Sequence, residues 1–164
     1  MAKIAGILIT LCVLQAISMA AAGRPEKSPY CVRGRVYCDP CRAGFETSAS
    51  TYLHGAKVKL ECRHRQTQKV LYSAEATTDE SGLYKIYVAN DQKDNVCDTV
   101  LVSSPHSSCK LADPGRDRSR VVLTSFNGMV SNDRDANNMG FTMEHPMSYC
   151  GQLMKQYQLT DDEV

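Results

Sequence analysis

The chain has 164 residues, of which eight are cysteine and none is tryptophan, and its formal net charge is +1. This length is typical of one domain, and the near balance of charge excludes a protein that binds nucleic acid by bulk charge. A hydrophobic fraction of 43% with 23% charged residues is ordinary for a globular protein, so the composition excludes wholesale disorder.

The first 22 residues have the pattern of a secretory signal peptide. Residues 1–3 form a positive start, residues 4–20 are apolar, and the small residues 20–22 offer a cleavage site. The apolar run is shorter than the roughly 20 residues that a membrane helix needs, and no basic stop follows it. We therefore predict that residues 1–22 are removed and that the mature protein is secreted to the extracellular space or cell wall, with no membrane span.

Removal of the signal peptide changes the cysteine count from eight to seven, because Cys12 lies within it. In an oxidising compartment most of the remaining cysteines should be paired. Seven is an odd number, so one cysteine is left over. The seven are Cys31, Cys38, Cys41, Cys62, Cys97, Cys109 and Cys150.

The mature chain starts with a polar, proline-containing lead-in over residues 23–30, followed by a domain that we place at residues 31–160. Short stretches of alternating or β-branched residues predict strands, and turn signals such as Asp79 and Gly82 separate them. This spacing predicts an all-β fold, an antiparallel barrel or sandwich of about seven strands. The predicted strands cover residues 32–38, 57–62, 70–76, 83–88, 97–102 and 120–124, with a short one near Phe141.

The C-terminal part of the chain has a different character. Residues 127–146 are rich in Asn, Asp and Gly, which is typical of a loop. Residues 148–159 predict a short α-helix whose apolar side chains recur at helical spacing and should pack against the sheet: Cys150, Leu153, Met154 and Tyr157. Residues 161–164 form an acidic tail. The methionines of the mature chain all lie in this last quarter, where we expect them to fill the core: Met129, Met139, Met143, Met147 and Met154.

Motifs for catalysis or metal binding are sparse. Cys38 and Cys41 form one C-x-x-C pair, which suggests a thiol oxidoreductase or half of a zinc site. The pair ends a predicted strand instead of starting a helix, and no second close pair accompanies it, so we favour structural disulfides. The sequence has no hydrolase, metalloprotease or phosphate-binding motif, and the four histidines are scattered. We predict a protein that is not an enzyme and that needs no metal and no cofactor.

Basic residues form two clusters, one with Arg63 and Arg65 and one with Arg116, Arg118 and Arg120. They are candidate contacts with an acidic partner, either an acidic wall polysaccharide or an acidic receptor surface. The alternative, which we favour, is a solvated strand edge on which charge discourages aggregation.

One string is diagnostic. Residues 34–45, GRVYCDPCRAGF, closely resemble the signature of the Ole e I-like pollen proteins, the family of the olive pollen major allergen. The resemblance continues through residues 55–62, 78–86 and 116–118 and covers the mature chain. It implies a secreted, non-enzymatic β-barrel or sandwich with a C-terminal helix. It also implies a role in pollen hydration, germination or tube growth through receptor kinases, and many members of the family are allergens.

The resemblance also implies a disulfide pattern, Cys38 with Cys109, Cys41 with Cys150, and Cys62 with Cys97. Sequence alone allows fifteen pairings of six cysteines. The chain departs from the family at Arg33, where an acidic or amide residue is usual, and it contains no N-glycosylation sequon.

Cys31 is extra to the family pattern. Strand parity predicts that it lies on the solvent face with Arg33, Arg35 and Tyr37, as a thiol that is capped or that links two chains into a dimer.

Three functions therefore compete. The first is a secreted interaction or signalling ligand that binds a cell-surface receptor or another extracellular protein. The second is a cell-wall protein that binds acidic polysaccharide through Arg116, Arg118 and Arg120. The third is a secreted thiol oxidoreductase that uses Cys38 and Cys41.

Overall fold

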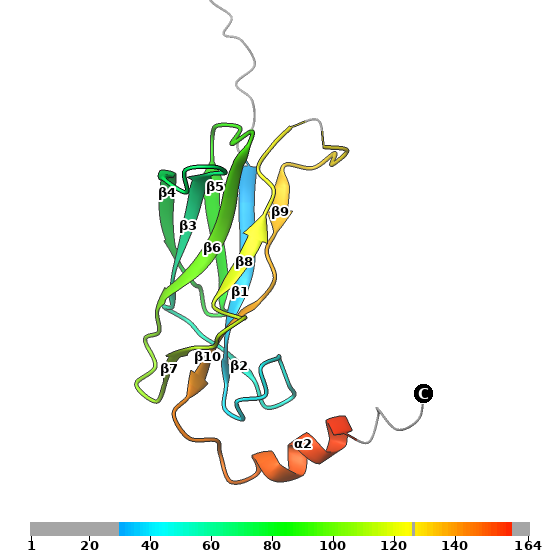
Figure 1. Ribbon diagram of the computed structural model, residues 1–164. Helices are drawn as coiled ribbons and strands as arrows, with labels where there is room; N and C mark the ends of the chain where they lie inside the picture. The colour runs from blue at the N-terminus through cyan, green and yellow to red at the C-terminus, as the bar shows by residue number, and fades with distance from the viewer. Residues whose placement is uncertain (1–29, 126, 159–164) are drawn as a thin grey trace, which may run out of the picture.

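The computed structural model describes residues 30–125 and 127–158 (Figure 1). The predicted signal peptide, nearly all of the lead-in and the acidic tail lie outside the described residues. The first strand begins at Tyr30, one residue before the domain boundary that the sequence suggests. The described chain forms two β-sheets and one short helix, so the predicted all-β fold with a C-terminal helix is confirmed. The sheets form an open sandwich and not a closed barrel.

One sheet is antiparallel and has the strand order β4–β3–β6–β8. Its strands form where apolar and polar residues alternate, so that Val58, Leu60 and Cys62 of β3 are buried while Lys57 is exposed. The bounds are Lys57–His64 for β3, Val70–Thr77 for β4, Asn95–Ser103 for β6 and Arg118–Val121 for β8.

The second sheet is arranged around β1, which runs the length of the sandwich (Figure 1). The first half of β1 pairs with β5 and β9, the second half pairs with β2 and β10, and β10 in turn pairs with β7. The bounds are Tyr30–Asp39 for β1, Thr51–Tyr52 for β2, Leu83–Val88 for β5, Cys109–Ala112 for β7, Asp133–Asp135 for β9 and Met139–Met143 for β10.

The expected count of about seven antiparallel strands is therefore too low, and the second sheet is mixed. Ten strands are present in the described residues, and β1 pairs in parallel with both β9 and β10. Strands β2, β7 and β9 are two to four residues long, too short for a period-two pattern to be visible in sequence.

The burial of Tyr37 also differs from the prediction. Val32 and Val36 face the core as expected, but Tyr37, predicted on the solvent face, is only 1% exposed. The reason is the parallel neighbour β10. A Cβ on Gly140 would lie 2.8 Å from the Tyr37 ring, so this glycine lets the ring lie directly on the β10 backbone.

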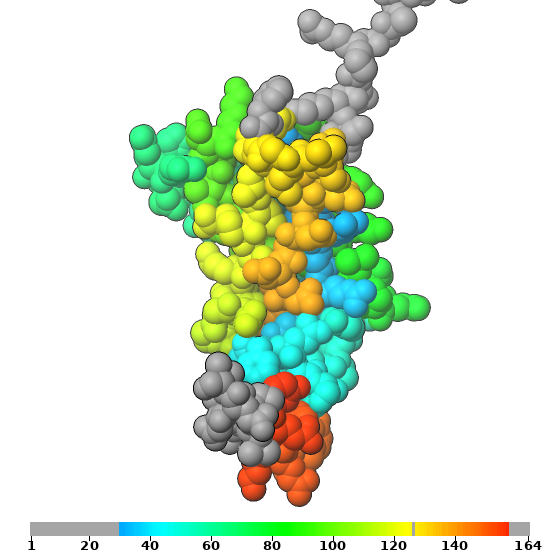
Figure 2. All heavy atoms as spheres, turned by 90° about the vertical axis from the view of Figure 1, so that its right-hand side faces the viewer, coloured from blue at the N-terminus to red at the C-terminus, as the bar shows by residue number. Residues whose placement is uncertain are grey.

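The helix α2 (Cys150–Gln158) lies below both sheets and not against either of them (Figure 1), so that prediction is wrong. Figure 2 shows the red helix at the lower end of the molecule, beneath the cyan segment that follows β1. The helix contacts that segment through Tyr157, whose ring centroid lies 5.3 Å from that of Phe45. The Tyr157 hydroxyl also accepts a hydrogen bond from the Ser48 N–H (3.2 Å).

We predict that the turn before β5 depends on a glycine. Gly82 has a φ of +72°, and a Cβ there would lie 2.8 Å from both the Val36 carbonyl oxygen and the Tyr52 Cβ. Gly82→Ala should lower the free energy of unfolding by about 2–3 kcal/mol, because backbone strain and a steric clash add together. Denaturant unfolding measures this loss.

Gly115→Ala is the matched control. Gly115 has a φ of +88°, but no atom lies within 4 Å of a Cβ built there. This substitution should cost about 1 kcal/mol, from backbone strain alone. Equal losses at the two glycines would contradict the tight packing around Gly82.

Candidate functional site

The structure contains three disulfides, Cys38–Cys109, Cys41–Cys150 and Cys62–Cys97. They are the pairs that the family pattern implies. The two cysteines of the C-x-x-C pair are bonded to different strands or helices, so they do not form the single reversible bridge that a thiol oxidoreductase needs. Each cysteine of the C-x-x-C segment instead links the end of β1 to another element, β7 or α2.

The turn around this pair is held by a buried carboxylate. Asp39 is fully buried, and its two oxygens accept hydrogen bonds from the backbone N–H groups of Cys41 (2.9 Å) and Gly44 (3.0 Å). Arg116 then donates from Nε to the Gly44 carbonyl (2.8 Å). The diagnostic string of residues 34–45 therefore specifies a fixed turn at the end of β1, and the helix is attached to that turn through Cys41.

Cys31 is the one cysteine without a disulfide among the described residues. It is half-buried and not fully exposed as predicted, although it does lie on the outward face of β1. Its neighbours across the strands are Tyr87 of β5 and Asp133 of β9. The Tyr87 ring is 63% exposed, so this face of the sheet is open to solvent beside the thiol.

Arg33, the residue that departs from the family pattern, also lies on this face. It forms ion pairs with Asp133 (3.1 Å) and Asp135 (2.6 Å) of β9. The hydrogen bond from Arg33 lowers the pKa of Asp135. The extra positive charge on β1 is thus matched by two carboxylates on the parallel neighbour.

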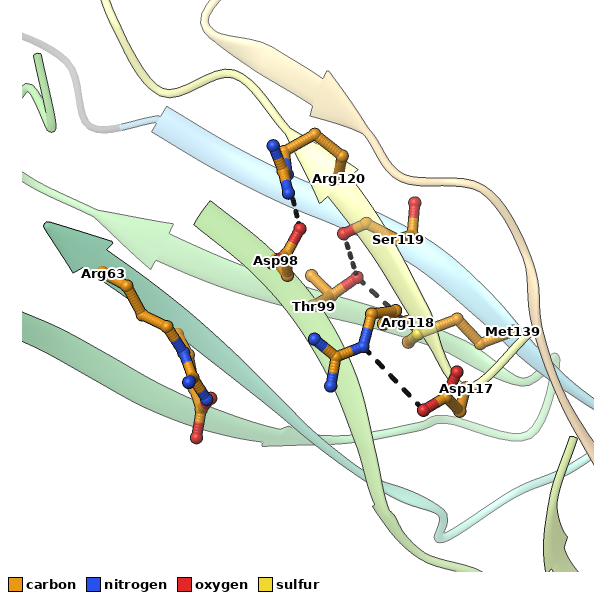
Figure 3. Close-up of polar contacts among 9 residues, drawn as sticks. Arg63, Asp98, Thr99, Asp117, Arg118, Ser119, Arg120 and Met139 are labelled. Atoms are coloured by element: carbon orange, nitrogen blue, oxygen red, sulfur yellow. Dashed lines mark hydrogen bonds and ion pairs between the residues drawn. The ribbon is translucent and has the colours of Figure 1, made fainter. Parts of the chain in front are cut away.

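The outer face of the four-stranded sheet has several ion pairs, and Figure 3 shows two of them, Arg120 with Asp98 and Arg118 with Asp117. Glu61 contacts Lys59 (2.6 Å) and Arg63 (2.5 Å) on its own strand. These two hydrogen bonds lower the pKa of the Glu61 carboxyl. Arg120 of β8 contacts Asp98 of β6 across the sheet (2.5 Å). Each of these three cations therefore has a carboxylate beside it, and Glu61 is shared by two of them.

The structure does not bring the five predicted contact arginines into one patch. Arg63, Arg118 and Arg120 share the outer face of the sheet, and each lies beside a carboxylate; for Arg118 this is Asp117, at 3.8 Å. Arg116 precedes β8 and is bound to the Gly44 carbonyl. Arg65 lies in the turn between β3 and β4, and it lines a small hollow together with Arg120. Exposed, paired arginines of this kind contribute little to stability.

An apolar groove, which sequence reasoning did not identify, lies beside β7. We call it the β7 groove; its volume is about 510 Å³, and Leu111, Met143 and Met147 form its apolar lining. Leu111 is 43% exposed and Met147 44%. The expectation that the methionines fill the core therefore holds for Met139, which is fully buried, but not for Met147. The clustering of methionine late in the chain is the sequence feature that could have indicated this groove.

The walls of the β7 groove are fixed from both sides. Cys109 of β7 is bonded to Cys38, and Arg42 donates from its guanidinium to the carbonyls of Met143 (3.1 Å) and Glu144 (2.9 Å). The backbone N–H of Met147 donates to the Pro40 carbonyl (3.1 Å). A groove held this way loses little conformational entropy when it binds a partner.

Residues 30–125 and 127–158 contain no group of three or more His, Cys, Asp or Glu side chains placed to hold a metal ion. Within the same residues, no helix is long and apolar enough to cross a membrane.

Comparison with known proteins gives consistent results. Residues 28–158 match the family model described as "Pollen protein Ole e 1 like". The chain is 40% identical to the pollen-specific protein C13 of Zea mays, over 97% of this chain and 92% of that protein. It is 44% identical to the pollen allergen Phl p 11 of Phleum pratense, over 83% and 96% respectively.

A solved structure agrees with the fold. The crystal structure of the major plantain pollen allergen Pla l 1 superposes with a TM-score of 0.64 at 26% identity, covering 73% of this chain and 98% of that one.

We predict that two of the disulfides stabilise different parts of the molecule, the C-terminal helix and the sandwich. The double variant Cys41→Ser/Cys150→Ser should leave the sandwich folded but release α2, so that trypsin cleaves at Lys155. The variant Cys62→Ser/Cys97→Ser should instead lower the free energy of unfolding of the sandwich by about 2–5 kcal/mol and leave α2 protected. Limited proteolysis with mass spectrometry separates the two outcomes, and peptide mapping of the unreduced protein tests the three pairings. Protection of Lys155 in the first variant would contradict this role of the bridge.

Proposed function

Because the chain belongs to the family of pollen proteins like Ole e 1, we propose that it is a secreted, non-enzymatic ligand of a cell-surface receptor or another extracellular protein. Its role is in pollen hydration, germination or tube growth, and receptor kinases are the partners. The signal-peptide pattern of residues 1–22 supports secretion. The three long-range disulfides support action in an oxidising environment.

The β7 groove is the observation that supports protein recognition most strongly. It combines exposed apolar side chains with walls fixed by disulfides and hydrogen bonds. Lys110, Glu144 and His145 provide a polar rim around Leu111 and Met147. An apolar centre with a polar rim is the usual anatomy of a protein–protein contact. We propose that a receptor ectodomain inserts an apolar side chain into this groove.

Substitution of two residues that line the β7 groove tests this proposal. The double variant Leu111→Asp/Met147→Asp should lower affinity for the cognate receptor-kinase ectodomain at least about tenfold, because a charge would be desolvated at the centre of the contact. Surface plasmon resonance against a panel of purified ectodomains measures the affinity, with the oxidised wild-type protein as reference.

Val70→Asp is the matched control. Val70 is also 43% exposed, but it lies at the start of β4, beside the β3–β4 turn and away from β7. It should leave the affinity within about twofold of wild type. An equal loss of affinity in the two variants, or no binding of the wild-type protein to any ectodomain, would contradict the proposal.

We also propose that Cys31 is capped or links two copies of the chain, since it is left without a partner after three bridges form. The secreted protein should run as a dimer on a non-reducing gel, or its intact mass should exceed that of the sequence by a thiol adduct. Cys31→Ser should abolish either signal without altering the fold. A monomer with an unmodified Cys31 contradicts the proposal.

A further inference from the structure

The methionines of the described residues differ in how far solvent reaches them. Met139 of β10 is fully buried, and its sulfur lies 3.7 Å from the Thr99 hydroxyl of β6. Met129 and Met147, by contrast, are 52% and 44% exposed. A methionine reacts with a dissolved oxidant only where the oxidant reaches its sulfur. Met129 and Met147 are therefore the side chains that a small oxidant meets first.

Of these two residues, Met147 belongs to the β7 groove. It lies in the segment between β10 and α2 (Figure 1), and it lines the groove together with Leu111, whereas Met129 precedes β9 and is not part of the lining. The Met147 backbone is held on both sides. Its N–H donates to the Pro40 carbonyl (3.1 Å), and its carbonyl accepts from the Cys150 N–H (3.0 Å). A chemical change in the Met147 side chain therefore alters the groove without releasing its wall.

The relevant chemistry is the transfer of oxygen from a hydroperoxide to a thioether. The sulfur forms a bond to one peroxide oxygen, and the O–O bond breaks. With hydrogen peroxide the second oxygen leaves as water, so the sulfur loses the two electrons that the peroxide gains. The product is methionine sulfoxide, a polar side chain whose new oxygen accepts hydrogen bonds.

A sulfoxide at this position works against binding of an apolar group. The unoxidised thioether of Met147 adds to the apolar surface of Leu111 and Met143. The sulfoxide oxygen is instead solvated by water, and Lys110, which lines the same groove, offers it a charged donor. An apolar side chain that enters the groove removes this solvation, and burial of a polar group without a partner is costly.

We propose that a hydroperoxide oxidises Met147 to its sulfoxide and that this modification prevents apolar ligands from binding in the β7 groove. The inference rests on the binding role proposed above for the groove. It adds a chemical control to that role, because the groove binds while Met147 is a thioether and loses affinity once it is oxidised. The buried Met139 stays reduced under the same conditions, so the sandwich keeps its fold.

The site of modification is tested on the full secreted protein with the substitution Cys31→Ser, so that the free thiol does not consume peroxide. After limited treatment with dilute hydrogen peroxide, peptide mass mapping should find an added oxygen on Met129 and Met147 before Met139. Oxidation of Met139 as fast as Met147 overturns the proposal.

The effect on the groove is measured without any receptor, by titration with anilinonaphthalene sulfonate, a dye that fluoresces on apolar surface. Peroxide should weaken dye binding at least about fivefold in the Cys31→Ser protein and in the matched control Met129→Leu, but less than about twofold in Met147→Leu. Methionine sulfoxide reductases should restore binding. Equal losses in the two variants, or no loss in the parent protein, overturn the proposal.

The same proteins are then compared on the receptor-kinase ectodomains. Oxidation should lower the affinity of the parent protein and of Met129→Leu, and spare Met147→Leu. If no ectodomain binds even the untreated protein, the receptor role fails and the dye titration still decides the modification. If an ectodomain binds equally well before and after oxidation of Met147, the modification proposal is overturned and the receptor role stands.

Discussion

The arrangement of β1 is the constraint on which the rest of the structure depends. This ten-residue strand pairs with four others, β5 and β9 along its first half and β2 and β10 along its second. Its last residue, Asp39, is fully buried and fixes the turn from which Cys38 and Cys41 reach β7 and α2. The positions of the β7 groove and of the helix both follow from where β1 ends.

Local pattern predicted strands of both sheets, because β3 and β5 each have one buried face and the alternation is visible in sequence. It did not predict the environment of Tyr37, which depends on the absence of a side chain at Gly140 in a parallel neighbour about a hundred residues away. The helix was predicted from its period, but a period does not specify which surface the apolar stripe contacts. Here it contacts the segment around Phe45.

The arginines illustrate why clusters along a sequence do not identify a surface. Residues 116, 118 and 120 are close in number, yet the first is bound to the Gly44 carbonyl while the other two lie outward on β8. Their carboxylate partners include Asp98, which lies on another strand, so this pairing is not visible in the sequence. Conversely, one small hollow is lined by Arg65, Lys93 and Arg120 only because the β3–β4 turn and the β5–β6 loop lie at the same end of the sandwich.

The bridge between Cys41 and Cys150 spans 109 positions of the chain and uses the last cysteine. A ribosome must therefore have completed almost the whole polypeptide before this bond is able to form, whereas the partners Cys62 and Cys97, 35 positions apart, emerge much earlier. Attachment of α2 is accordingly a late event of maturation, and until it occurs Cys41 is an available thiol beside the nascent groove. A chain terminated before residue 150 would lack this bridge, and its Cys41 would have no native partner.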